Sequence, residues 1–358
     1  MSDAVHSLLQ SYADPQVIEV VVNDDGSVFL ERSGAHLEKQ PFRVGPADID
    51  LFLKTILGRI ESFGPSRPYA DLSARDGSRV HVISPPLVRG GLCVTSRKRP
   101  SRRPHLGELT RGGAITLGCA AFLKFAAKHH RNILIIGGAS SGKTTLLNAL
   151  ASLIPNEERV IVLEDTPELM LPQPHAMYLR TRVRDAAGLP DITLRDLLIN
   201  TLRMRPDRII VGEVRSVEAL DMLQAMNVGH EGVMCTLHAN SAREGLQRLE
   251  TLVLSSGLDL PLRAVRSTIG LAIDLMVVMS RLADGSRRVT QVTEVTGMEL
   301  DNITLSDLFL MDARKTAGGM GFALRPTGSM PRFYDRLRQQ GEETPLEFFQ
   351  ETESETPS

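Results

Sequence analysis

The chain has 358 residues, of which 42% are hydrophobic and 23% are charged, a balance that is typical of a globular protein and excludes a fibrous or disordered one. The 41 Lys and Arg residues against 43 Asp and Glu residues leave a formal net charge of -2, so the chain as a whole is no general polyanion binder. Aromatic residues make up only 4% and Trp is absent, so few side chains can stack on bases, and no direct nucleic acid partner is expected.

The length favours two domains, at about 150 residues per domain. The three cysteines, Cys93, Cys119 and Cys235, lie far apart and form no CxxC pair, so neither a disulfide framework nor a zinc site is predicted. The first ten residues lack the basic start of a signal peptide, and no apolar run approaches the roughly 18 residues of a membrane span. We therefore expect a cytoplasmic protein that touches a membrane only from outside.

The first hundred residues predict an α+β domain, placed at 1–96. Residues 17–31 hold two β-rich runs around an Asp-Gly turn, and a second Asp-Gly turn near residue 76 predicts another hairpin. Between the two hairpins, apolar residues recur at helical spacing over 49–63. One further strand is expected near 92–95.

Residues 97–106 predict the domain boundary. Their run RKRPSRRPH contains two prolines and five Arg or Lys residues, so it continues neither a helix nor a central strand. The simplest interpretation is a solvated basic linker. Two functional alternatives stay open, namely an arm that reaches a nucleotide phosphate and a patch for anionic lipid.

From 107 to 341 helical and buried-strand patterns alternate, which is typical of a mostly parallel sheet covered by helices. The acidic tail 342–358 carries six Glu and no Lys or Arg, so it is predicted to be disordered. The expected helices are 116–130, 143–152, 193–204, 216–226, 241–255 and 261–272, and the expected strands are 132–136, 159–163, 208–212, 232–236 and 286–296.

The strongest chemical motif is GGASSGKT, which begins at Gly137 and fits GxxxxGK[ST] between an apolar strand and a helical run. Glycines let the backbone curl closely around a phosphate, and the helix N-terminus adds a favourable dipole. In such a loop, Lys143 is expected to reach the β- and γ-phosphates and Thr144 to hold Mg²⁺. The sequence therefore predicts an ATP site.

Polar side chains at three other strand ends are candidates for the chemistry. Glu213 ends an apolar strand, where a P-loop protein needs a carboxylate for Mg²⁺ or water. Glu164, Asp165 and Glu168 follow the strand after the P-loop helix, and neighbouring strand ends are expected to bring Glu164 near Glu213. Two such acids would divide metal contact from activation of water, although Asp165 could merely cap a turn. His238 follows a further strand, where a structural role and a catalytic role both remain open.

The chain has no NKxD-like guanine reader and no LSGGQ-like signature, which leaves a motor-type or recombinase-type ATPase. Its motif-bearing segments resemble the secretion ATPases of type II and type IV systems, and most closely the Tad (tight adherence, Flp) pilus assembly branch. The resemblance spans about residues 14–312. The similar segments are GGASSGKTTLLNAL, VIVLEDTPEL, LRMRPDRIIVGEVRSVEALDMLQAMNVGHEGVMCTLHANS and RRVTQVTEVTGME.

This resemblance implies a PAS-like N-terminal domain, a RecA-like P-loop domain, and a ring of six chains that couples ATP hydrolysis to pilus assembly or secretion at inner-membrane platform proteins. Arg79 and Arg97 match arginines that reach a nucleotide bound by a neighbouring chain. The implied catalytic residues are Glu164, Glu168, Glu213, His238, Arg203, Arg215, Arg79 and Arg97. The implied nucleotide-binding residues are Gly137, Gly138, Ala139, Ser140, Ser141, Gly142, Lys143, Thr144 and Thr145, with Thr144 and Glu213 at Mg²⁺.

The leading hypothesis is an ATP-hydrolysing hexameric motor for a Tad-type pilus or a related secretion machine, located in the cytoplasm at the inner membrane. One alternative is a type IV secretion ATPase of the conjugation or effector-export kind. Another is a subunit that binds nucleotide without hydrolysing it and gates assembly.

Overall fold

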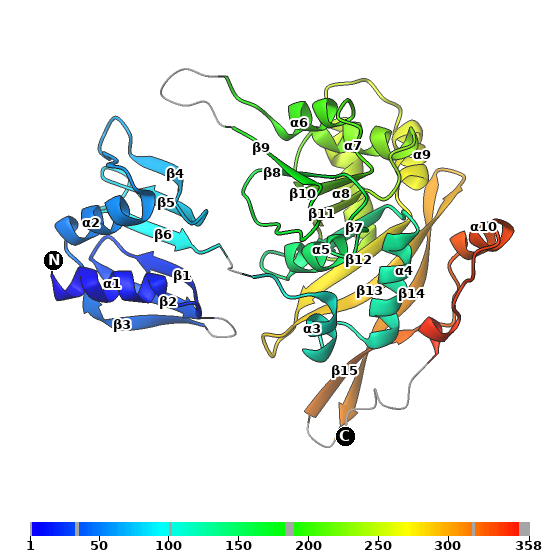
Figure 1. Cartoon of the computed structure of the whole chain (residues 1–358), viewed down its shortest axis with the longest axis horizontal. Helices are drawn as coiled ribbons and strands as arrows, with labels where there is room; N and C mark the ends of the chain where they lie inside the picture. The colour runs from blue at the N-terminus through cyan, green and yellow to red at the C-terminus, as the bar shows by residue number, and fades with distance from the viewer. Residues whose placement is uncertain (1, 33–35, 100–101, 183–189, 317–318, 351–358) are drawn as a thin grey trace. The chain divides into compact units, whose positions relative to one another are not determined.

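The protein consists of two compact units, Met1–Arg102 and Arg103–Ser358, which are considered one at a time (Figure 1). The structure is a computed structural model that describes residues 2–32, 36–99, 102–182, 190–316 and 319–350, without the side chains of 313–321. Within the described residues, no helix combines the length and the apolar character needed to cross a membrane.

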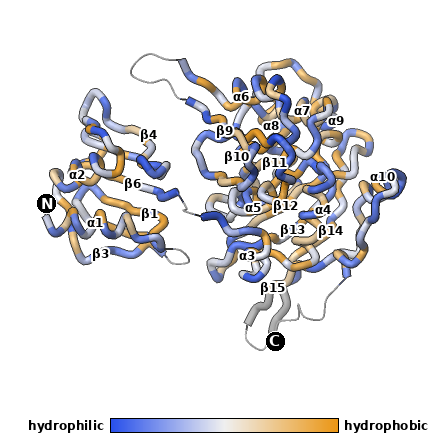
Figure 2. Tube along the Cα trace, in the orientation of Figure 1, coloured by the Kyte–Doolittle hydropathy of each residue, from blue (hydrophilic) through white to orange (hydrophobic). Residues whose placement is uncertain are grey.

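The first unit is an antiparallel six-stranded sheet in the order β3-β2-β1-β6-β5-β4, packed with α1 (Asp3–Ala13) and α2 (Pro46–Leu57) around one apolar core. Alternate strand residues enter that core, and Figure 2 shows the hydrophobic stretch along β1. Both Asp-Gly hairpins are confirmed, at the β1–β2 and β4–β5 turns. The strands are β1 Val17–Val22, β2 Ser27–Arg32, β3 Leu37–Arg43, β4 Tyr69–Ser73, β5 Arg79–Ile83 and β6 Cys93–Arg97.

The helix expected over 49–63 is shorter than predicted, because α2 ends at Gly58. Gly58 has a φ of 72°, and the Arg75 side chain occupies the space that a Cβ there would need. The start of the basic run 97–106 also belongs to the first unit. Arg97 closes β6, and the amide of Lys98 donates to the Ile18 carbonyl. Residues 100–101 of that run lie outside the described residues.

The second unit is built on a nine-stranded sheet in the order β15-β14-β13-β12-β7-β11-β10-β8-β9. The six strands from β9 to β12 are parallel, as the alternation of helices and strands predicts, and β13, β14 and β15 extend the sheet antiparallel. The strands are β7 Ile133–Gly137, β8 Val160–Glu164, β9 Ala176–Arg180, β10 Arg208–Val214, β11 Met234–His238, β12 Leu275–Arg281, β13 Arg287–Glu299, β14 Asn302–Thr316 and β15 Gly319–Pro326.

Helices cover both faces of this sheet, which explains why its central strands are continuously apolar. In β7, Ile133 and Ile135 face the core formed with α4 and α5, whereas Leu134 and Ile136 face the core formed with α6 to α9. The helices are α3 Leu106–Arg111, α4 Leu117–Lys128, α5 Lys143–Ala151, α6 Leu194–Thr201, α7 Glu218–Asn227, α8 Ala242–Leu254, α9 Leu262–Ala272 and α10 Phe333–Gln339.

The structure differs from the expectation of disorder over 342–350. A short 3₁₀ helix, Glu347–Phe349, packs against α4, and the Phe349 ring lies 5.2 Å from that of Phe309. The acidic composition predicted disorder, but Phe348 and Phe349 stand among the acids and pack their apolar side chains against the core. Residues 351–358 lie outside the described residues.

Candidate nucleotide-binding site

The site is assembled by the carboxyl ends of neighbouring parallel strands. β7, β11, β10 and β8 are successive and parallel, so their carboxyl ends meet at one edge of the sheet. Gly137 ends β7, and His238 of β11 is its direct partner across the strands. Glu164 ends β8, and Glu213 lies near the end of β10. The structure thus brings the P-loop and the residues expected at three other strand ends to the same edge.

The backbone of the P-loop is tightly curled, with little space for a side chain at one position and left-handed dihedral angles at two others. A Cβ on Gly137 would collide with the Met279 carbonyl and the Ser141 hydroxyl, so only glycine fits there. Ser140 and Gly142 have φ values of 55° and 99°, in the left-handed region. The chain therefore curls tightly before α5 begins at Lys143.

Lys143 folds back onto its own loop. Its Nζ donates to the carbonyls of Gly137, at 2.9 Å, and Gly138, at 2.8 Å. Burial lowers the pKa of Lys143, an effect that the nearby Glu213 and Glu168 carboxylates oppose. These carboxylates thus lie close enough to Lys143 to favour its protonated form.

The loop offers the donor set that a phosphate chain requires. The Ser141 hydroxyl is buried and has no hydrogen-bond partner among the described residues. The Thr144 side chain is half-buried at the start of α5, where backbone amides point out of the helix. A lysine, helix amides and hydroxyls are the donors that bind a nucleotide phosphate chain. Mg²⁺ bound to phosphates usually takes only one or two ligands from the protein, and the Thr144 hydroxyl and a nearby carboxylate fit that number.

The Glu213 carboxyl group contacts two basic side chains. Its Oε1 lies 3.0 Å from Nε2 of His238, and its Oε2 accepts a hydrogen bond from Arg215. Burial lowers the pKa of His238, as does the charge of Lys143, so the imidazole is neutral at pH 7. The hydrogen bond to Glu213 raises the pKa of Arg215. The Glu213 carboxyl group thus lies between an imidazole and a guanidinium beside the P-loop.

Glu164 supports the acidic segment that follows it. The carboxyl group is buried, and its Oε1 accepts hydrogen bonds from the amides of Glu168 and Leu169, both at 2.9 Å. Gly212 in the neighbouring strand makes room for it, because a Cβ there would lie 3.1 Å from Cγ of Glu164. Glu164 therefore fixes the turn that carries Asp165 and Glu168, which places both of these acids near Arg215.

Sequence reasoning missed two residues that position this cluster. Arg103, within the basic run, donates through Nε to the Glu168 carbonyl at 3.1 Å and lies 3.5 Å from its carboxylate. Glu218 is buried, and its Oε1 accepts from the amides of Arg215 and Ser216 at 2.7 and 2.8 Å. The charge of the basic run was a usable signal for Arg103, whereas no pattern marked Glu218 as the residue that fixes the turn at Arg215.

The structure does not bring Arg203 to this edge. Arg203 precedes β10, whose amino end lies at the opposite edge of the parallel strands. The seven residues of β10 span about 20 Å, at roughly 3.3 Å per residue. Arg203 is exposed at that opposite edge, too far from the P-loop of its own chain to contact a nucleotide bound there.

Arg79 and Arg97 lie side by side in the first unit. They are directly paired across β5 and β6, on the open face of the sheet. Arg79 lies 3.3 Å from an Asp71 oxygen, and both side chains are about half exposed. Arg97 is also the direct cross-strand partner of Glu19 in β1, so each arginine of the pair has an acidic residue beside it.

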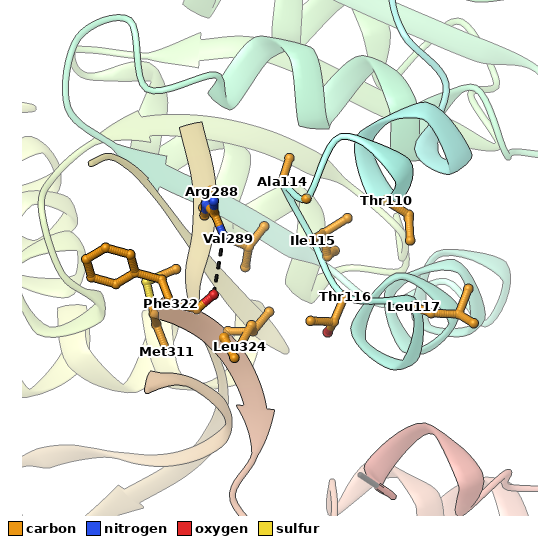
Figure 3. Close-up of a pocket in the computed structure, with 12 residues that line it drawn as sticks. Thr110, Ala114, Ile115, Thr116, Leu117, Arg288, Val289, Met311, Phe322 and Leu324 are labelled. Carbon is orange, nitrogen blue, oxygen red and sulfur yellow. Dashed lines mark hydrogen bonds between the residues drawn. The ribbon is translucent and has the colours of Figure 1, made fainter. Parts of the chain in front are cut away.

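A separate pocket of about 330 Å³ lies elsewhere in the second unit (Figure 3). It contains no P-loop residue and is mostly apolar, so it is not part of the nucleotide site. Its lining residues are Thr110, Gly113, Ala114, Ile115, Thr116, Leu117, Arg288, Val289, Met311, Phe322, Ala323 and Leu324.

Comparison with known proteins identifies the family of this chain. The family model for type II/IV secretion system proteins matches residues 72–302. A conjugal transfer protein, TrbB, from Rhizobium radiobacter is 35% identical over 289 residues, which cover 79% of this chain and 85% of that protein. A type IV secretion system protein, VirB11, from Brucella suis biovar 1 is 32% identical over 308 residues, which cover 77% and 84% of the two chains.

Other relatives match over a smaller share of their length. Two putative conjugal transfer proteins from Mycobacterium tuberculosis are 36% identical over 214 residues, so the match spans 60% of each of them.

The solved structure of a pilus retraction motor, PilT, with bound ADP is 16% identical and has a TM-score of 0.59, covering 100% of this chain and 98% of that one. This likeness confirms the predicted fold class alone. On the strength of the family model and of the TrbB and VirB11 relatives, the chain belongs to the type II/IV secretion ATPase family.

Proposed function

We propose that this chain is an ATP-hydrolysing motor subunit of a type IV secretion machine of the conjugation or effector-export kind. The observation that carries the proposal is the cluster at the carboxyl edge of the sheet, where Lys143, Glu213 and His238 converge from three strand ends. The named relatives favour this kind of machine, since they are a conjugal transfer protein and a type IV secretion system protein.

In this proposal, Lys143 leaves the carbonyls of Gly137 and Gly138 and meets the β- and γ-phosphates of ATP. Thr144 and Glu213 hold Mg²⁺, which supplies charge neutralisation at the phosphates when it is bound. The remaining residues from Gly137 to Thr145 contribute amides and hydroxyls to the phosphate chain.

The three acids are assigned different roles according to what their carboxyl groups contact. Glu164 is engaged by two backbone amides, so we assign it to holding the acidic segment. Glu213 and Glu168 lie close enough to Lys143 to affect its pKa, which suits them to metal contact and to orienting the attacking water. His238 is neutral beside Glu213 and can accept a proton or orient that water.

We further propose that six chains form a ring in which Arg79 and Arg97 reach the nucleotide of a neighbour. The cross-strand pairing of these two arginines supports the idea, because two guanidinium groups on one open sheet face can bracket a phosphate. Arg203 lies away from the P-loop edge, so its catalytic role would also need another chain. The ring is proposed to work in the cytoplasm against membrane proteins of the secretion machine.

A phosphate-release assay on the purified full chain tests the proposed activity. We expect Mg²⁺-dependent release from ATP that is lost in Lys143→Ala and kept in Lys128→Ala, which removes an exposed lysine at the end of α4. Nucleotide binding without release would favour the alternative of a non-hydrolysing assembly subunit. Wild-type release in Lys143→Ala would overturn the assignment of the P-loop.

The cargo is tested in cells. A deletion strain complemented with the wild-type or Lys143→Ala gene is scored for plasmid transfer, for effector export and for surface pili. Loss of transfer or export supports the proposal. Loss of pili alone supports the second candidate, a Tad-type pilus motor, which rests on the resemblance of the motif-bearing segments.

A further inference from the structure

Two arginines outside the chemistry described so far lie beside the P-loop. β12 is the parallel neighbour of β7 (Figure 1). Met279 is paired to Gly137, the last residue of β7, so Arg281 extends past the carboxyl end of β7. The hairpin between β12 and β13 then returns the chain, and Arg287 is the direct cross-strand partner of Arg281. Both side chains are exposed.

The two arginines lie on the face of the sheet that carries the P-loop helix. Side chains alternate along a strand, so Arg281 shares the face of Met279, and Arg287 shares the face of Val289. Met279 and Val289 belong to the core formed with α4 and α5. The arginine pair therefore continues that face beyond the edge where the P-loop lies.

The stem of the Arg287 side chain lies next to Gly142 of the P-loop. A Cβ on Gly142 would lie 3.6 Å from Cδ and 3.7 Å from Cβ of Arg287, and 3.1 Å from Cε of Met279. The Arg287 stem therefore lies beside the residue that precedes Lys143. α5 begins directly after Gly142, so its first backbone amides lie close to this stem.

Neither arginine has an ion pair or a side-chain hydrogen bond among the described residues, and two like charges directly opposite each other destabilise a hairpin. The next residue behaves differently. Arg288 donates to the Phe322 carbonyl at 3.3 Å, as Figure 3 shows, and to the Ser286 hydroxyl at 3.2 Å. The two exposed arginines beside the P-loop are thus available to an anionic ligand, whereas Arg288 is already engaged.

We propose that Arg281 and Arg287 bind the phosphates of the nucleotide held by the P-loop of the same chain, as a second cationic contact opposite Lys143. The proposal rests on the proposed nucleotide site. Arginine suits it because the planar guanidinium offers paired donors to phosphate oxygens. It differs from the roles proposed for Arg79 and Arg97, which act on the nucleotide of a neighbouring chain.

Binding of fluorescent ADP and ATP analogues to the full chain with Mg²⁺ tests this inference. We expect Arg287→Ala to raise the Kd for both nucleotides about tenfold to a hundredfold, the effect of losing a charge-assisted hydrogen bond. Arg281→Ala should have a smaller effect in the same direction, and Arg287→Lys should restore part of the affinity. Arg263→Ala is the matched control, because Arg263 pairs with Asp301 at the opposite edge of the sheet.

The melting temperature separates binding from folding. Without nucleotide, Arg287→Ala should melt no lower than the wild type, because the substitution removes a like-charge contact. With ADP, the increase in melting temperature should be smaller in Arg287→Ala than in the wild type or Arg263→Ala. A lower melting temperature without nucleotide, at unchanged Kd, would mean that Arg287 is only structural and would overturn the proposal.

Two further results distinguish the possible failures. If Arg281→Ala/Arg287→Ala binds nucleotide as the wild type does while Lys143→Ala loses binding, the arginine inference is wrong and the P-loop proposal stands. If Lys143→Ala also binds normally, the P-loop proposal itself fails. Loss of ring assembly in the double variant at unchanged Kd would mean that the pair meets acids of another copy, which also overturns the inference.

Discussion

Glu213 and His238 meet across β10 and β11, with Oε1 of the carboxylate 3.0 Å from Nε2 of the imidazole. The contact forms because the two parallel strands end at the same edge, and the Thr236 hydroxyl, which donates to the Gly212 carbonyl at 2.6 Å, ties these strand ends together. It places a neutral imidazole beside the carboxylate that we assign to Mg²⁺ and water.

Replacing Glu213 by Gln should therefore separate binding from hydrolysis. The amide keeps the shape of the side chain and loses its charge, so ATP should still bind while hydrolysis falls by about 10² or more. Phosphate release and fluorescent-nucleotide binding measure the two effects, with the exposed Glu157→Gln as control. Equal turnover in Glu213→Gln and Glu157→Gln would exclude a role for this carboxylate.

Lys143→Ala should abolish hydrolysis and weaken ATP binding. The substitution removes the one cationic side chain within a loop that otherwise offers neutral amides and hydroxyls. In the free protein it also leaves the carbonyls of Gly137 and Gly138 without their lysine donor, so hydrogen exchange at the loop should increase. Unchanged exchange would contradict the fold-back contact of Lys143.

The pH dependence of hydrolysis should report on His238. Burial holds its pKa below the ordinary value of about 6.5, so the side chain stays neutral down to a lower pH than a free histidine. Activity should be flat between about pH 7 and 8 and should fall below about pH 6, as the imidazolium forms and pairs with Glu213. His238→Gln should lack this acid limb, and an identical limb in both proteins would assign it to another group.

The same shift affects stability with a definite sign. Since the folded pKa of His238 lies below the unfolded one, the unfolded chain binds more protons between them, and the free energy of unfolding decreases as the pH falls through about 6.5. The drop in melting temperature from pH 7.5 to 5.5 should thus be smaller in His238→Gln than in the wild type. A larger drop in the variant would reverse the assigned direction.

Arg79→Ala or Arg97→Ala should lower turnover by about 10³-fold while rings still form, because an arginine beside a transferring phosphoryl group contributes on that scale. Mixing tests whether the contact joins two chains. Lys143→Ala subunits keep the arginine pair, and arginine-variant subunits keep the P-loop, so mixed rings should regain part of the activity. Mixed rings that form yet stay as inactive as either parent would show that the arginines do not act between chains.

Phe349→Ala should destabilise the second unit by about 1–3 kcal/mol, less than a fully buried phenylalanine because the ring is only partly covered. The ring packs with Phe309 and Phe122 against α4. The urea midpoint measures the effect, and the exposed neighbour substitution Gln350→Ala serves as control. Equal midpoints in the two variants would mean that the 3₁₀ segment adds no stability.

The sequence predicted the parts of the fold that depend on local pattern. The Asp-Gly turns, most of the helices and four of the six parallel strands carry a local pattern in the sequence, and the P-loop carries its own spacing. Of the parallel strands, β9 and β12 were not predicted. The strand β12 was missed because its apolar run Leu275–Met279 follows a helix directly, without a turn signal between them. β14 and β15 were missed because an antiparallel extension is specified by pairing across the sheet rather than along the chain.

For the site, sequence order identified strand ends but not contacts. It placed Glu164 near Glu213 through neighbouring strands, yet only the structure gives the backbone amides that occupy Glu164. Arg203 matched a motif by position, and the direction of β10 then put it at the far edge. Arg103 and Arg287 lie next to site residues that are distant in sequence, which no local pattern records.

The position of Arg103 in the chain has a consequence for the acidic segment Glu164–Glu168. Arg103 is the first residue of the second unit, and its guanidinium holds both the carbonyl and the carboxylate side of Glu168. The acidic segment is thus attached at two points, to the beginning of the second unit through Arg103 and to the end of β8 through Glu164. Loss of the Arg103 contact would leave the Glu168 backbone held by Glu164 alone.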